Sequence, residues 1–113
     1  MIDLMHITRQ EDWLKALAEG SYRADSLDSQ GFIHCSSPTQ VVAAANRFYR
    51  GQHGLVLLGI DSGLIQAEVR WENLEGGKDL FPHIYGPLNL EAVSKVFEFE
   101  PDQNGQFSSP NLA

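Results

Sequence analysis

The spacing of apolar residues divides this chain into short strands and helices. The stretch that ends at Ser36 alternates in polarity, which predicts a strand whose successive side chains point to opposite faces. Phe32, His34 and Ser36 then share one face, where the two polar side chains border a cleft. Ile33 and Cys35 have the opposite parity, so the same pattern places them in the core.

A helix is predicted directly after this strand. Ser37 suits the N-cap and Gln40 the third helical position, which together form a capping box, and Pro38 suits the first position. Apolar residues recur with the spacing of one helical face over residues 41–48, and Gly51 should lie beyond the helix end. Free N–H groups at a helix start favour anions, so we expect a phosphate or carboxylate to bind there.

A second helix is predicted over residues 8–19. Thr8 and Glu11 form a capping box at its start, and Gly20 suits its end. Its expected apolar face consists of Trp13, Leu14, Leu17 and Ala18.

Four further segments have the pattern of strands: residues 2–7, 55–60, 66–72 and 96–99. Residues 55–60 are apolar throughout, which predicts a strand covered on both faces. Residues 66–72 alternate, which directs Trp71 inward and Glu68 and Glu72 into solvent. The sum is an α+β fold with a largely antiparallel sheet of five or six strands and two main helices. We expect one domain over residues 1–100 and a frayed, polar C-terminal tail over residues 101–113.

Composition narrows the classes of function. A net charge of −7 with 8 Lys and Arg argues against sequence-independent binding of nucleic acid, which needs clustered cations. The single cysteine, Cys35, excludes an internal disulfide and suits a reducing compartment. The sequence shows no apolar run long enough for a bilayer and no signal-peptide pattern at its start, so we expect a cytoplasmic protein without membrane contact.

Three histidines, His6, His34 and His83, lie at ends of predicted extended segments. Two prolines and a glycine restrict the backbone around His83 and Tyr85, as in loops that position binding groups. One hypothesis is a ligand or catalytic pocket formed by these side chains, because imidazole suits acid–base chemistry near neutral pH. A zinc site formed by the three histidines is an alternative, although no metal-ligand spacing supports it. Cys35 is better explained as a small buried hydrophobe than as a nucleophile.

The chain resembles the small bacterial proteins grouped as domain of unknown function 952. The likeness covers nearly the whole predicted domain and is most specific in four strings: Met5-His6-Ile7, Gly31-Phe32-Ile33-His34-Cys35-Ser36, Ala45-Asn46-Arg47-Phe48-Tyr49 and Phe81-Pro82-His83-Ile84-Tyr85-Gly86-Pro87-Leu88. That family is considered a distant relative of the ADP-ribosyltransferase-like superfamily, near the RNA 2′-phosphotransferases.

The resemblance implies a split antiparallel sheet that binds NAD, ADP-ribose or a similar small nucleotide. It implies that His6 contacts the nicotinamide ribose, that His34 orients the nicotinamide, and that Tyr49 stacks on the ring. A catalytic glutamate on a third strand would be Glu72 or Glu98, or else His83 or Tyr85 would take that position.

The leading hypothesis is therefore a nucleotide-binding domain with ADP-ribosyltransferase-like activity. Its catalytic candidates are His34, His83 and Tyr85, and its cofactor-binding candidates are His6, His34, Ser36, Ser37 and Tyr49. One alternative is a non-enzymatic module that binds a small anion or a protein, with structural histidines. Another is a metal-dependent hydrolase.

Overall fold

The computed structural model describes residues 1–74 and 76–110. This part of the chain contains three α-helices, α1 (Gln10–Glu19), α2 (Asp25–Gln30) and α3 (Val41–Phe48). Its eight strands are β1 (Leu4–Arg9), β2 (Ser21–Tyr22), β3 (Ile33–His34), β4 (Leu55–Ile60), β5 (Glu68–Glu72), β6 (Phe81–Tyr85), β7 (Leu88–Asn89) and β8 (Val93–Phe99). Two short 3₁₀-helices are η1 (Ser62–Leu64) and η2 (Leu90–Ala92). The predicted α+β class with antiparallel pairing is confirmed, but the described residues form three sheets with eight strands and three α-helices, not one sheet of five or six strands with two main helices.

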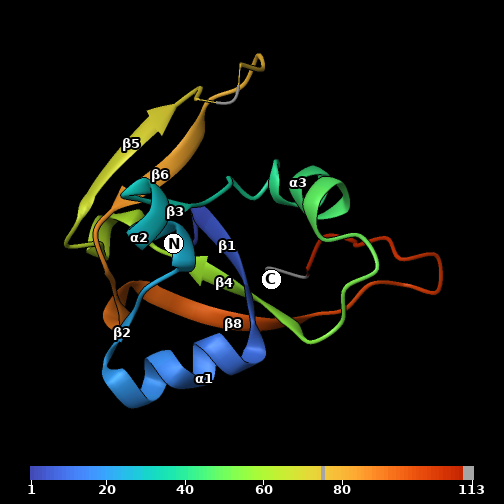
Figure 1. The fold of residues 1–113 in the computed structure, drawn as a ribbon, viewed down its shortest axis with the longest axis horizontal. Coiled ribbons are helices and arrows are strands. Elements are labelled where there is room, and N and C mark those ends of the chain that lie inside the picture. The colour runs from blue at the N-terminus through green and yellow to red at the C-terminus, as the bar shows by residue number, and fades with distance from the viewer. Residues whose placement is uncertain (75, 111–113) are drawn as a thin grey trace.

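The strands form three antiparallel sheets in the orders β1-β4-β8, β3-β6-β5 and β2-β7. All residues of β4 are buried, as its continuous apolar sequence predicts. One face of β4 packs with Trp13 and Ala16 of α1, whereas the other face packs with Val41 and Ala45 of α3. In Figure 1, α1 and α3 accordingly lie on either side of the strands β1 and β4. Each fully buried Leu or Ile of this core stabilises the fold by about 1.5–3 kcal/mol.

The two three-stranded sheets meet at a single described bridge between β1 and the chain after β3. The N–H of Met5 donates to the carbonyl of Ser36 over 2.7 Å, and the N–H of Ser36 donates back to Met5 over 2.8 Å. Beyond this bridge, β4 is the one strand in the described part of the chain that pairs with β1, along residues 4–9. The open edge of β1 determines where the main groove of the molecule lies.

Two predictions for the first helix are wrong. Thr8 belongs to β1 instead of capping α1, and its hydroxyl lies 3.0 Å from the hydroxyl of Tyr22. Leu14 and Leu17 are 55% and 52% exposed, because α1 rests on the sheet through Trp13 and Ala16. The predicted end at Gly20 is confirmed, with φ of 87° at that glycine.

Other differences follow from short elements that the pattern does not reveal. The segment between the predicted helix over residues 8–19 and the predicted strand that ends at Ser36 contains α2, and the strands β2 and β7 have two residues each. Trp71 is exposed and Glu72 half-buried, the reverse of the expected alternation, because β5 is an edge strand whose far end extends past the core. In Figure 1 the β5–β6 hairpin projects on the side of the molecule away from α1.

The C-terminal segment is ordered over residues 101–110, where fraying was expected. Phe107 is only 4% exposed and stacks on Phe99 with ring centroids 4.7 Å apart. Asn46 of α3 holds its backbone, accepting from the Phe107 N–H over 2.7 Å. A single aromatic residue therefore anchors a segment of otherwise polar sequence. Residues 111–113 of the predicted tail lie outside the described residues.

Candidate functional site

A groove of about 1120 Å³ opens where β1 separates from β3. Its walls are the edge of β1, the helix α1 and the chain from Ser21 to Gln30 on one side, and the start and outer face of α3 on the other. Because Met5 uses its N–H and C=O toward Ser36, alternation along β1 directs the same groups of Ile7 to this open edge. The groove therefore offers backbone hydrogen-bonding groups as well as side chains.

His6 lines this groove, but both of its ring nitrogens are hydrogen-bonded within the protein. Nδ1 donates to the carbonyl of His34 over 2.5 Å, and Nε2 lies 2.7 Å from the hydroxyl of Tyr22. Burial lowers the pKa of His6 to about 4, although the bond to the His34 carbonyl favours the charged form. His6 is thus neutral at pH 7 and fixes the strand that carries His34. Its predicted contact with a ribose stays a prediction.

The neutral state of His6 orders the neighbouring hydroxyl groups. A carbonyl can only accept, so the single proton of the neutral ring is on Nδ1 and Nε2 accepts from Tyr22. The hydroxyl of Thr8 lies 3.0 Å from the same tyrosine hydroxyl and is the third group of this hydrogen-bond network. Burial raises the pKa of Tyr22, which keeps that proton in place.

The predicted helix start is a turn over residues 38–40 followed by α3. Gln40 accepts from the Ser37 N–H over 3.0 Å through its side chain, which is the reciprocal half of the predicted capping box. The N–H groups of Gln40 and Val41 donate to the Ser37 carbonyl. Three of the N–H groups expected to meet an anion are therefore used inside the turn. Ser36 lines the groove, whereas Ser37 directs its hydroxyl to Thr39, 3.1 Å away.

Arg47 and Tyr49 lie at the end of α3 beside the groove. Tyr49 is half-buried against the second core cluster, and burial raises its pKa. Of the cations that line the groove in the described chain, Arg9, Lys15 and Arg23 form ion pairs. Arg47 forms none there and lies over the ring of Phe48, with 5.1 Å between its guanidinium carbon and the ring centroid. It is the groove cation best placed to receive an anion.

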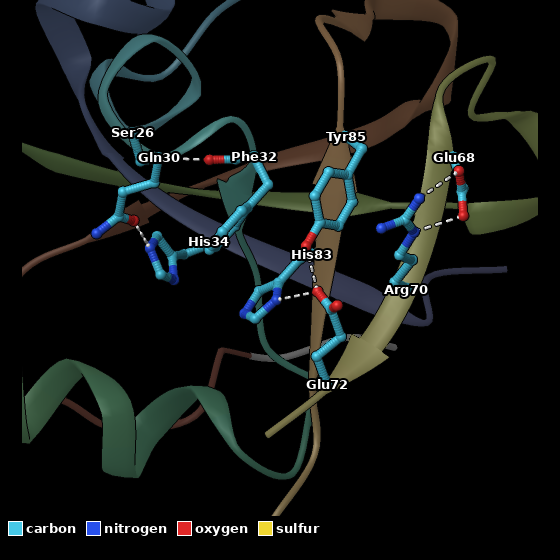
Figure 2. Close-up of polar contacts among 9 residues, drawn as sticks. All are labelled: Ser26, Gln30, Phe32, His34, Glu68, Arg70, Glu72, His83 and Tyr85. Carbon is cyan, nitrogen blue, oxygen red and sulfur yellow. Dashed lines mark hydrogen bonds and ion pairs between the residues drawn. The ribbon is translucent and has the colours of Figure 1, made fainter. Parts of the chain in front are cut away.

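A second group of polar side chains occupies one face of the sheet β3-β6-β5 (Figure 2). The register places His34 opposite His83 and His83 opposite Arg70, so the two rings lie 5.3 Å apart in an edge-on arrangement. Glu72 accepts from His83 Nδ1 over 2.9 Å and from the Tyr85 hydroxyl over 2.5 Å. Figure 2 shows both partners converging on one carboxylate oxygen.

Phe32 and Gln30 complete this arrangement. Phe32 stacks on His83 with 4.3 Å between ring centroids. His34 Nε2 donates to the Gln30 side-chain carbonyl, as Figure 2 shows, so α2 holds this ring from the other side. His34 also lines the groove and thereby connects the groove with the cluster on the sheet.

The charges of the cluster are arranged to keep Glu72 ionised. Hydrogen bonds from Tyr85 and then from His83 lower the pKa of Glu72, and the bond to Glu72 raises the pKa of Tyr85. Arg70 binds Glu68 at 2.6 Å and stacks over Tyr85, 4.4 Å from the ring centroid. An ionised carboxylate can accept from both neighbours at once and hold them in place.

The structure thus divides the predicted site residues into two neighbouring groups. His6, His34, Ser36 and Tyr49 line the groove, whereas His83 and Tyr85 lie in the cluster beside His34. The prediction of one common hollow for all three histidines is wrong, because His83 does not line the groove. Glu72 was expected to be a solvated strand charge and is instead the shared acceptor of the cluster. Glu72 shares a face with His83 only through the register of β5 and β6, so the sequence held no local signal for this contact.

Cys35 lacks the properties of a nucleophile. The thiol is buried in the core, and burial raises its pKa, so the thiolate is disfavoured. Among the described side chains, no group of three His, Cys, Asp or Glu converges as metal ligands. No helix in the described part of the chain has the length and apolar character needed to cross a bilayer.

Fold and site together define a small α+β domain of antiparallel sheets, with a groove beside a histidine–carboxylate cluster. The chain belongs to the family described as protein of unknown function (DUF952), whose family model matches residues 7–96. None of the curated proteins matches it.

Solved structures of protein CC0527 from Caulobacter crescentus are similar to this chain. Its crystal structure has 30% sequence identity and a TM-score of 0.84, and the alignment covers 93% of this chain and 92% of that one. A crystal structure of its double mutant gives a TM-score of 0.83 at the same identity and coverage. Its solution NMR structure gives 0.81 with 31% identity, covering 94% and 91% of the two chains. The fold is therefore shared along nearly the full length of both chains.

Proposed function

We propose that the groove binds a nucleotide of the NAD or ADP-ribose class, and that the chain transfers or hydrolyses the ADP-ribosyl group. The observation that carries the proposal is the groove itself, which measures about 1120 Å³ and is lined by His34, Ser36, Tyr49 and Arg47. Small-ligand sites have volumes of about 300–1,000 Å³, so this one suits an extended ligand. The resemblance to domain of unknown function 952, which is considered a distant relative of the ADP-ribosyltransferase-like superfamily, adds support.

Each part of such a nucleotide has a matching group in the groove. The pyrophosphate needs a cation, which Arg47 supplies without breaking an ion pair among the described residues. A base or carboxamide edge needs a donor and an acceptor, which the Ile7 backbone presents at the open edge of β1. His34 lies next to the cluster on the sheet β3-β6-β5, so it suits the reacting end of the ligand. His83 and Tyr85 remain catalytic candidates behind it.

Thermal unfolding with NAD and with ADP-ribose tests the proposal. A ligand at about ten times its Kd stabilises the folded state by about 1.4 kcal/mol, which raises Tm by about 5 °C in a domain of this size. His34→Ala and Arg47→Ala should each reduce the shift. Arg50→Ala is the matched control, because Arg50 lies three residues further along and outside the groove lining.

The outcomes separate the proposal from its alternative. The absence of a shift with both nucleotides would refute it. An equal shift with pyrophosphate alone would favour a non-enzymatic module that binds small anions.

A further inference from the structure

The contacts of His83 point to a function that is more specific than structural support. Its side chain is only 2% exposed, yet just one of its ring nitrogens is hydrogen-bonded to a described residue, namely Nδ1 to Glu72. Among the described residues, every fully buried side-chain nitrogen or oxygen has a hydrogen-bond partner. Nε2 of His83 has no hydrogen-bond partner among these residues, so it is not fully buried.

The carboxylate of Glu72 determines which nitrogen carries the proton. An ionised carboxylate can only accept, so Nδ1 donates to it and the neutral ring has its lone pair on Nε2. Tyr85 restrains the same carboxylate oxygen, and Phe32 fixes the plane of the imidazole by stacking. The ring thus has a fixed tautomer and a fixed direction, which are the two requirements for an efficient general base.

The groups that face this ring come from all three strands of its sheet. His34 contributes from β3, Glu72 and Arg70 from β5, and Tyr85 from β6. Arg70 is paired with Glu68 and stacked on Tyr85, so among the described residues the charge that directly contacts His83 is the Glu72 carboxylate. This carboxylate holds the Nδ1–H of the ring and leaves Nε2 as the nitrogen that can take up a proton.

We infer that His83, oriented by Glu72, is the proton acceptor for a hydroxyl group that attacks the nucleotide held in the neighbouring groove. This inference rests on the proposed function, since it places the reacting end of the nucleotide at His34, whose ring centroid lies 5.3 Å from that of His83. The substrate class is then a hydroxyl acceptor, either water or an alcohol.

The proposed step is balanced without a further reactant. The hydroxyl proton moves to His83 Nε2 while the hydroxyl oxygen forms a bond to C1 of the ribose. The bond from C1 to the nicotinamide nitrogen breaks, and nicotinamide leaves with the electron pair as a neutral molecule. The imidazolium then releases its proton to solvent, and Glu72 stays ionised throughout.

Two measurements on the wild-type chain test the inference without an activity assay. Long-range ¹H–¹⁵N spectra at pH 8 should show His83 protonated on Nδ1 and bare on Nε2. Diethyl pyrocarbonate, which acylates unprotonated imidazole nitrogens, should modify His83 in the folded protein. His6 serves as the sealed control because both of its nitrogens are bonded, and exposed His53 serves as the reactive control. The opposite tautomer, or a His83 as unreactive as His6, would overturn the inference.

Ligand protection connects His83 to the groove. ADP-ribose at about ten times its Kd should slow the modification of His83 about tenfold, because only the free protein reacts, and leave His53 unchanged. Stabilisation by ADP-ribose without this protection would overturn the inference. The absence of any stabilisation by NAD or ADP-ribose would instead refute the proposed function and its nucleotide.

A pair of matched variants tests the role of the carboxylate. Glu72→Leu, which removes the acceptor, should abolish the preference for the Nδ1–H tautomer of His83. Glu100→Leu is the control, because Glu100 forms the same kind of bond with His53 at the surface, 2.8 Å long. An unchanged His83 tautomer in a folded Glu72→Leu protein would contradict the orientation by Glu72.

Discussion

Acid should destabilise this fold through His6, and the size of the effect follows from its burial. Folded His6 has its pKa lowered to about 4, against an ordinary value of 6.5. The unfolded chain therefore takes up a proton between these values while the folded chain does not. Stability is complete above the unfolded pKa and is lost as the pH falls from 6.5 toward 4.

The magnitude can be worked from the two pKa values. Between about pH 7 and about pH 4.5, the free energy of unfolding should fall by about 2.5 kcal/mol through His6 alone. The side chain is buried, so solvent does not screen this effect. Protonation would also place a proton on Nε2. Nε2 would then donate to the Tyr22 hydroxyl, which would have to turn its own proton away.

Urea unfolding of the wild type and of His6→Gln at several pH values measures this contribution. The difference between the two proteins cancels the titration of the carboxylates and of the other histidines. The wild type should lose about 2.5 kcal/mol more than the variant between about pH 7 and about pH 4.5. Parallel losses in both proteins would refute the buried, neutral His6.

Two further predictions concern the core. Phe107→Ala should lower the free energy of unfolding in urea by about 3 kcal/mol, because it removes a buried ring stacked on Phe99, whereas Ser108→Ala at an exposed position should change little. A change below about 0.5 kcal/mol for Phe107→Ala would show that the segment is not anchored. Cys35 should react with a disulfide reagent only as fast as the chain unfolds, because its thiol is buried and its pKa is raised. Rapid reaction of the folded protein would show an accessible thiolate and restore Cys35 as a candidate nucleophile.

Two patterns of apolar residues in the sequence predicted correctly which side chains are buried. The continuous apolar run of β4 predicted a strand covered on both faces, and the alternation around His34 placed Ile33 and Cys35 in the core. The helix α1 ends at Gly20, as the sequence predicted, and this glycine has a left-handed conformation. These features depend on local chemistry and on one buried sheet, so they can be predicted from a single sequence.

Features that depend on tertiary pairing were not predictable in the same way. Thr8 looks like a helix cap, but the pairing of β1 with β4 extends through Arg9 and keeps Thr8 in the strand. The partner of His83 depends on the register of β5 and β6, which no local pattern reveals. The groove depends on where β1 and β3 separate, and the one bridge described there joins Met5 to Ser36, the second residue after β3 and 31 positions further along the chain. The sequence therefore indicated the residues of the site but not their division into groove and cluster.

The most direct test of the nucleotide groove is an amide ¹H–¹⁵N titration of the chain with ADP-ribose. We predict saturable shifts at Ile7, Ser36, Arg47 and Tyr49, which border the groove, with no comparable shifts at η1 outside its lining. Spectra that stay unchanged at millimolar ADP-ribose, or shifts confined to residues outside the groove, would contradict the account.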